Sequence, residues 1–291
     1  MPVRAEKNNK FASGLIRQRQ YLMIESYKKY ISPGAWFTMS YPAVWNEFED
    51  TEGSFLFYNP NAWTGNFRIS AYRGDEMYGR DSIVQELKDN PDARKVQVGP
   101  LTCAYSKEDF EEDGVPYTTH FWITGRENTA FECSFTVRRG EPTAEAEAVI
   151  SSLQVRREGQ KYPAELIPVR VSEIYQIDEA YEWVVNKVKE MLNKDFQGME
   201  EDVVSLQQLV DKASFSPKKR EVWLSLGIAL CVIMANETDG WEWQTLVDGN
   251  REVPVLMQQD TARVVDPMKL VWSRVRAGEE IDLPAIYAGI L

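Results

Sequence analysis

The sequence predicts an α+β protein: an antiparallel sheet covered by helices, followed by a helix-rich α+β domain with a small antiparallel sheet. The first half has short aromatic and β-branched runs between prolines and glycines, which indicate strands. The second half has apolar residues at helical spacing. At 291 residues the chain is long enough for two domains. We expect an N-terminal extension with a helix at 1–27, a first domain at 28–157, a linker at 158–170 and a second domain at 171–291.

The first domain is expected to consist mainly of strands. They are predicted at 35–41, 44–49, 55–58, 66–73, 95–98, 101–106, 117–124 and 130–138. Ser82 followed by Gln85 is typical of a capping box that begins a helix, which Asn90-Pro91 would end. Thr143 is expected to begin a second helix that runs to Leu153, with a return to strand at 154–157.

The second domain is expected to be built around an apolar helix at 218–235, begun by Ser216-Pro217 as N-cap and first helical residue. Its Gly227 predicts a close approach by a neighbouring element, for which the strand carrying Trp241 and Trp243 is the candidate. The remaining elements follow from periodicity and turn residues. They are helices at 177–192 and 202–213, a hairpin of 241–247 with 253–258, a strand at 262–265, and helices at 266–277 and 283–291.

Composition restricts the class of partner. Forty-five acidic and 33 basic residues give a net charge of −12, which argues against nucleic acid and anionic membrane as partners because both attract clustered Lys and Arg. No apolar stretch reaches the roughly 20 residues of a membrane helix, and the first residues lack the apolar core of a signal peptide. Three cysteines without paired spacing add no sign of an oxidising compartment. We therefore expect a cytoplasmic protein.

Catalytic motifs are scarce. His120 is the single histidine, so a histidine-based triad would have to use it and a multi-histidine metal site is impossible. Its place in an alternating strand favours a packing or hydrogen-bonding role. Gly74 and Gly79 have phosphate-loop spacing, but Arg80-Asp81 follows in place of Lys-Ser/Thr. We predict no catalytic residue, no metal ligand and no cofactor, and we favour a protein that is not an enzyme.

Two features are candidates for binding a partner. Trp63 lies in a polar loop where no core periodicity explains it, and exposed tryptophans often anchor protein contacts. An acidic cluster precedes Gly114 and is expected in a loop between strands: Glu108, Asp109, Glu111, Glu112 and Asp113. Each has an ordinary alternative, since Trp63 could fold back over the sheet and an acidic run is usually a solvated loop.

Particular residues carry two resemblances. Phe37–Tyr41 leading to Pro42-Ala43-Val44-Trp45, the strand Asn66–Tyr72 and the closing helix Ala144–Leu153 make residues 28–157 resemble the PsbP-like fold. This fold is shared by a photosystem extrinsic subunit and the Mog-type binders of the Ran GTPase, and it implies binding or assembly. No Ran-contact motif can be matched. The second domain is similar to an uncharacterised bacterial family of unknown function, through Leu226-Gly227-Ile228-Ala229-Leu230, Gly240-Trp241-Glu242-Trp243, Pro267-Met268, Arg274 and Gly278.

These observations lead to one main hypothesis and two alternatives. The main hypothesis is an intracellular bacterial protein-binding, assembly or regulatory module, an immunity partner being one form of it. The alternatives are a carboxylate-dependent hydrolase that uses an acidic loop, and a binder of small ligands at the interdomain cleft. A protein partner is expected, but neither its identity nor the oligomeric state can be read from the sequence.

Overall fold

The structure is a computed structural model that describes residues 27–51, 53–157, 159–249 and 251–290. The chain divides into two compact units, with the boundary between Glu158 and Gly159; the short 3-10 turn η1 (Pro33–Ala35) is grouped with the second. Antiparallel sheets packed with helices confirm the α+β class. The helix expected before Tyr27 lies outside the described residues.

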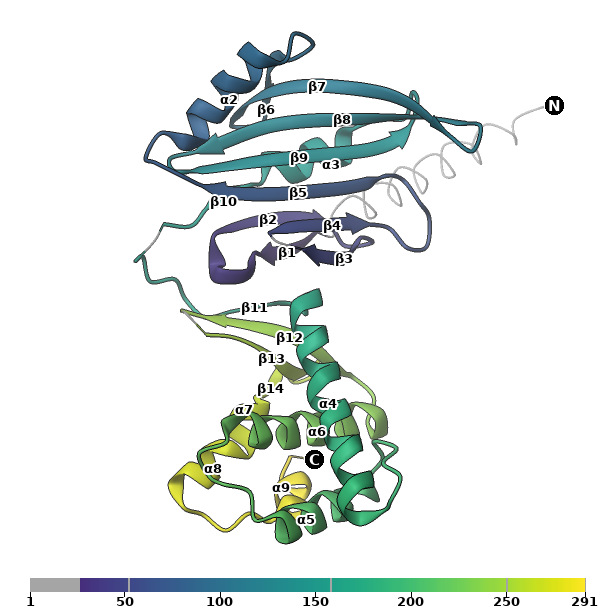
Figure 1. The fold of residues 1–291 in the computed structure, drawn as a ribbon, viewed down its shortest axis with the longest axis vertical. Coiled ribbons are helices and arrows are strands. Elements are labelled where there is room, and N and C mark those ends of the chain that lie inside the picture. Colours follow the sequence, from purple (N-terminus) through teal and green to yellow (C-terminus); the bar gives the residue numbers. More distant parts are fainter. Residues whose placement is uncertain (1–26, 52, 158, 250, 291) are drawn as a thin grey trace, which may run out of the picture. The chain divides into compact units, whose positions relative to one another are not determined.

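A seven-stranded antiparallel sheet forms the centre of the first unit, in the order β3-β4-β5-β9-β8-β7-β6 (Figure 1). Its strands are β3 (Asn46–Thr51), β4 (Ser54–Tyr58), β5 (Asn66–Arg73), β6 (Arg94–Val98), β7 (Leu101–Glu112), β8 (Val115–Arg126) and β9 (Thr129–Arg138). A smaller sheet has the order β1-β2-β10 and is formed by β1 (Tyr27–Ile31), β2 (Phe37–Pro42) and β10 (Gln154–Val155).

Alternation along the strands sends every second side chain to the inner face of the large sheet, where the core lies. Phe67 and Ile69 of β5, Trp122 of β8, and Cys133 and Phe135 of β9 are all fully buried there. Helix α3 (Ala144–Ser151) packs its buried residues into the same core, and so do β1 and β2 of the small sheet. Helix α2 (Tyr78–Asp89) contacts mainly β8 and β9. It begins against the β8–β9 turn, where the amide of Gly79 donates to the carbonyl of Glu127 at 3.0 Å.

The second unit has a four-stranded antiparallel sheet in the order β11-β12-β13-β14 and a group of helices. The strands are β11 (Glu165–Pro168), β12 (Trp241–Asp248), β13 (Arg251–Gln258) and β14 (Arg263–Val265). The helices are α4 (Val171–Leu192), α5 (Asp202–Ala213), α6 (Arg220–Glu237), α7 (Pro267–Leu270), α8 (Trp272–Ala277) and α9 (Leu283–Ala288). Helix α6 is buried along most of its length, as its all-round apolar sequence predicts. None of the helices in the described ranges combines the length and the apolar character needed to cross a bilayer.

Two helix starts differ from the sequence prediction. Helix α2 begins at Tyr78, and the hydroxyl of Ser82 donates to the Tyr78 carbonyl at 2.9 Å inside the helix. Helix α6 begins at Arg220, and Ser216 accepts a hydrogen bond from the backbone of Lys218 in the turn before it. In both cases a serine bonds a backbone group locally without capping the helix, an alternative that this residue type always offers.

Three other elements also differ. The expected linker contains strand β11, which pairs with β12 from Glu165↔Val247 to Pro168↔Gln244. The expected strand at 101–106 continues as β7 to Glu112. The helix expected at 266–277 is interrupted at Val271, where φ is −116°. Strand β1 was not predicted at all.

Candidate protein-binding site

Helix α2 covers only one end of the outer face of the large sheet. Figure 1 shows α2 at the opposite end of the sheet from the turn between β7 and β8. Side chains alternate between the two faces along β8, and Thr118 and Trp122 are buried on the inner face. The outer face therefore carries Tyr117, Thr119 and Phe121, each partly exposed. Antiparallel sheets often leave one face in water. This outer end is where both binding candidates from the sequence are found.

The β7–β8 hairpin places the acidic cluster on a strand. Its tip is Asp113-Gly114, with φ of 52° and 77°, the two positive values that a tight primed turn needs and that an Asp-Gly pair supplies. Register then pairs Asp109 with Thr118 and Phe110 with Tyr117. The expectation of a loop is therefore wrong for Glu108, Asp109, Glu111 and Glu112, and right for Asp113. Cross-strand partners outweigh the poor strand propensity of this acidic run.

Three aromatic rings form a row across the outer end of the sheet, which we call the aromatic row. The Trp63 ring meets Tyr117 edge-on with centroids 5.8 Å apart, and Tyr117 stacks on Phe110 at 5.5 Å. Trp63 and Phe110 are 41% and 37% exposed, so the row faces solvent. Of these three aromatic residues, only Trp63 was predicted from the sequence as a candidate for binding. Tyr117 and Phe110 were missed because their contact depends on hairpin register, which the sequence does not reveal.

Local hydrogen bonds fix the loop that carries Trp63. The side-chain oxygen of Asn59 accepts from the backbone of Asn61, and the indole N–H of Trp63 donates to Asn66 Oδ1 at 2.8 Å. Gly65 has φ of 134°, and an added Cβ there would lie 2.4 Å from the Phe135 ring. Only glycine allows the loop to approach the sheet this closely. Trp63 is therefore positioned over Tyr117 while part of its ring stays exposed.

The carboxylates of the hairpin divide between the two faces. Glu108 and Glu112 share the parity of Phe110, so they flank it on the outer face. Asp109 is on the other side, where it accepts from the Thr118 hydroxyl at 2.5 Å and lies 3.6 Å from Arg139. The Thr118 hydrogen bond lowers the pKa of Asp109, with a smaller contribution from Arg139. Asp109 is thus an ionised acceptor, unlike a general acid, which needs a raised pKa.

His120 is a structural residue of the inner face. Its Nδ1 lies 2.7 Å from the Tyr105 hydroxyl, and its ring stacks on Trp122 with centroids 5.9 Å apart. Burial lowers its pKa, and nearby Lys107 adds to this. Within the ranges that the structure describes, no group of three His, Cys, Asp or Glu side chains is arranged to hold a metal ion.

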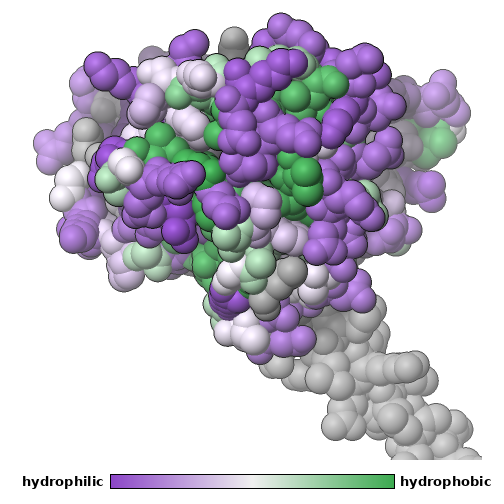
Figure 2. Space-filling model, turned by 90° about the horizontal axis from the view of Figure 1, so that it is seen from below, coloured by the Kyte–Doolittle hydropathy of each residue, from purple (hydrophilic) through white to green (hydrophobic). Residues whose placement is uncertain are grey.

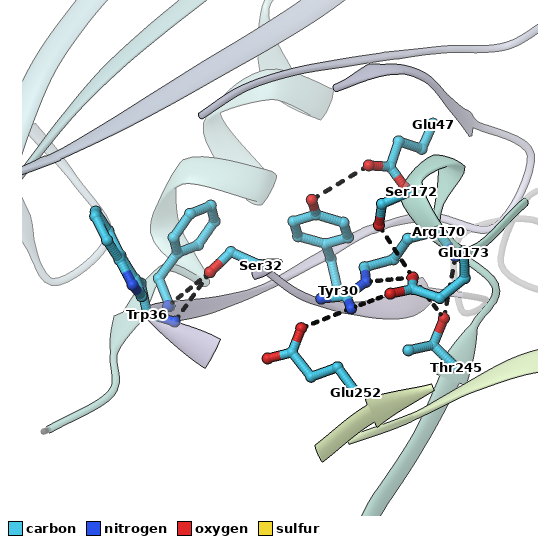
Figure 3. A network of polar contacts seen from close by, with 10 residues as sticks. Tyr30, Ser32, Trp36, Glu47, Arg170, Ser172, Glu173, Thr245 and Glu252 are labelled. Atoms are coloured by element: carbon cyan, nitrogen blue, oxygen red, sulfur yellow. Dashed lines mark hydrogen bonds and ion pairs between the residues drawn. The ribbon is translucent and has the colours of Figure 1, made fainter. Parts of the chain in front are cut away.

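Two carboxylates, buried Glu173 and partly buried Glu252, converge in the second unit around Arg170. The Arg170 guanidinium bonds both oxygens of Glu173, at 2.7 and 2.5 Å, and Glu252 at 2.7 Å. Figure 3 shows both carboxylates turned toward it. The Thr245 hydroxyl donates to Glu173 at 3.1 Å. Burial lowers the pKa of Arg170, but the bonds to the two carboxylates outweigh this effect and the net shift is upward. A permanent cation is therefore shared by the two carboxylates and balances one of their two negative charges, and the network ties α4 to β12 and β13.

The second unit also has a cavity of about 600 Å³ beside β14, α8 and α9. The main charged groups that line this cavity have hydrogen-bond or ion-pair partners within the second unit. Arg263 donates to the carbonyls of Gly289 and Ile290, and Asp266 caps α7 and pairs with Arg251. Figure 2, which shows the molecule from below, has its hydrophobic side chains in separate patches among hydrophilic ones. We take the aromatic row as the candidate contact surface because its rings touch in succession and two of them are exposed.

Comparison with known proteins places this α+β chain among uncharacterised domains. The chain belongs to the family described as "Domain of unknown function (DUF3805)", which matches residues 25–178. Residues 202–287 match a second family, "Domain of unknown function (DUF3806)". This confirms the resemblance of the second domain to a family of unknown function. No curated protein matches the chain.

Solved structures also match the chain. A crystal structure from Bacteroides thetaiotaomicron VPI-5482 is 60% identical, with a TM-score of 0.88, and the match covers 90% of this chain and 97% of that one. The cyanobacterial PsbP of Synechocystis sp. PCC 6803 matches at 14% identity and a TM-score of 0.26, over 46% of this chain and 94% of that one. LpqN of Mycobacterium tuberculosis, involved in cell envelope biogenesis, matches at 11% identity and a TM-score of 0.28. This match covers 48% of this chain and 96% of that one. A PsbP structure is thus among those that match the chain.

Proposed function

We propose that this protein binds another protein, and that the aromatic row is the anchor of the contact. The observation that carries the proposal is the meeting of Trp63, Tyr117 and Phe110 at an end of the sheet that α2 leaves open. Aromatic side chains that are partly exposed and held in place are typical of binding hot spots, since little entropy is lost when a partner covers them.

Charge defines the chemistry of the partner. Residues 107–117 contain five carboxylates and one lysine. Arg138, opposite Tyr117, and Arg139, near Asp109, offset this only in part. A segment rich in Lys and Arg, with an apolar side chain to cover the rings, complements this surface in charge and in polarity. The cytoplasmic location is part of the same proposal, supported by three buried cysteines that are all free thiols.

The hydrolase alternative receives less support. Asp109 has a lowered pKa, and Glu173 and Glu252 are paired with Arg170. A carboxylate that acts as general acid would need the opposite environment, apolar and without a cation.

The test is capture of partners from the native host with the full chain, in which Trp63→Ala is compared with Tyr175→Ala. Tyr175 is 57% exposed on α4 and serves as the matched control for loss of a surface aromatic residue. We expect Trp63→Ala to weaken binding by about tenfold or more, as for a hot-spot residue. Glu108→Lys combined with Glu112→Lys should also weaken it, whereas Tyr175→Ala should not.

The captured protein must then be purified and titrated at two salt concentrations. A basic partner should bind more weakly at higher salt, because the exposed charges are screened. Equal binding of the wild type, Trp63→Ala and the double lysine variant would contradict the proposal.

A further inference from the structure

A second cavity, in the first unit, has three arginines in its lining. It lies where β5, the β8–β9 turn and β10 end, and has a volume of about 500 Å³. Arg73, Arg156 and Arg157 contribute three cations, and Glu76 and Glu127 contribute two carboxylates. This position is separate from the aromatic row, which is formed by Trp63, Tyr117 and Phe110.

Arg73 is the unusual residue of this cavity. Its guanidinium lies over the Trp36 ring, with the central carbon 4.3 Å from the ring centroid. Stacking of this kind orients the plane of the guanidinium. Its Nε is shielded from solvent and has no hydrogen-bond partner among the described residues. A buried donor without an acceptor is costly, so the Arg73 guanidinium, which lines the cavity, gains from an added acceptor.

The charges around Arg73 favour an anion as that acceptor. Glu127 is already engaged by Arg157 at 3.1 Å, in an exposed pair that a competing anion could displace at little cost. An arginine fork matches the two oxygens of a carboxylate or phosphate. The chain as a whole is strongly acidic and repels anions, so binding here must come from this local arrangement.

We propose that the cavity binds a small oxyanion, a carboxylate or a phosphate, through Arg73. Its volume falls within the range of small-molecule sites, roughly 300–1,000 Å³. Trp36 supplies the wall on which the arginine rests, and Val155 adds an apolar surface.

The experiment is calorimetric titration of the full chain with inorganic phosphate and, separately, with citrate at constant ionic strength. We expect saturable binding of at least one anion, and a loss of affinity of about tenfold or more in Arg73→Gln. Arg68→Gln, on the same strand, removes the same charge and should bind like the wild type. Arg73→Lys retains the charge without the fork and should bind more weakly than the wild type, which guards against a folding defect in Arg73→Gln.

Binding of phosphate alone identifies a phosphoryl ligand, and binding of citrate alone a carboxylate. No saturable binding of either anion, or equal binding by Arg73→Gln and Arg68→Gln, would overturn the proposal.

Discussion

At the scale of single residues, His120 links protonation to folding. Burial lowers its pKa below the ordinary value of 6.5, so the unfolded chain takes up a proton at higher pH than the folded one. The contribution of His120 to the free energy of unfolding is therefore fully present above about pH 6.5. It is lost as the pH falls toward the pKa of His120 in the folded state. Because His120 is the single histidine of the chain, its contribution can be isolated.

We predict that His120→Gln removes the part of the pH dependence that lies just below pH 6.5. Denaturant unfolding of the wild type and the variant between pH 7.5 and 5.5 is the measurement, and the free-energy difference between them should change with pH only in the lower part of that range. A constant difference across the range would show that His120 has the same pKa in both states. We also expect partner binding to persist in this variant, since His120 lies on the inner face.

At the scale of elements, the contact between α6 and α7 depends on Gly227. A Cβ at this position would lie 2.2 Å from the backbone carbonyl oxygen of Pro267. The close approach predicted from the sequence is thus confirmed, but the neighbour is the start of α7 and not the strand with Trp241 and Trp243. The sequence gives no reason to choose Pro267, because α7 contacts α6 from a distant part of the chain.

We predict that Gly227→Ala destabilises the protein by about 1–3 kcal/mol through overpacking against α7. Helix propensity alone predicts the opposite sign, a gain of up to about 1 kcal/mol. Thermal and denaturant melts of the full chain therefore distinguish the two effects by sign. A stabilised Gly227→Ala variant would mean that α7 moves away from α6 without cost.

Elements with strong local patterns were predicted best. Strand β5 and helix α5 have the expected bounds, 66–73 and 202–213, because alternation in one and apolar spacing in the other are uninterrupted. Strand β1 was missed since Lys28 and Lys29 interrupt its apolar pattern, and β11 because Pro168 and the flanking charges are typical of a linker. Both strands are defined by pairing with a distant partner, which local sequence does not record.

The candidate site shows the same limit. Trp63 could be singled out because its loop has no core periodicity, and the acidic run because charge is visible in sequence. That the two lie at the same end of the sheet follows from the Tyr117–Phe110 register and from the Gly65 contact with Phe135. Arg73 and Arg170 were not predicted, because an isolated arginine carries no pattern that reports burial or its partners.

At the scale of the whole molecule, the second unit should require the residues that come directly before α4. Strand β11 supplies an edge of its sheet, and Arg170 forms ion pairs with Glu173 and Glu252. We predict that a fragment of residues 159–291 is more stable than one of residues 171–291 by about 3–5 kcal/mol, the cost of leaving the buried Glu173 carboxylate without its cation. Denaturant melts of the two fragments measure this difference.

Limited proteolysis of the full chain provides a second measurement of the same boundary. The first cut should fall between Arg157 and Ala164, before β11, because a paired strand is protected. Equal stability of the two fragments, or an early cut inside β11, would show that this strand is dispensable.

The order of the seven-stranded sheet has a consequence for the time at which the chain can fold. Strands β3, β4 and β5 are consecutive neighbours, and so are β6, β7, β8 and β9, so each group can form from local hairpins. The two groups are joined by β5 and β9 alone, through pairs from Asn66↔Thr136 to Arg73↔Thr129. Contacts between distant parts of a chain form late. On the ribosome, β5 therefore emerges with one edge open until β9 has been synthesised. During this interval the open edge exposes the nascent chain to aggregation.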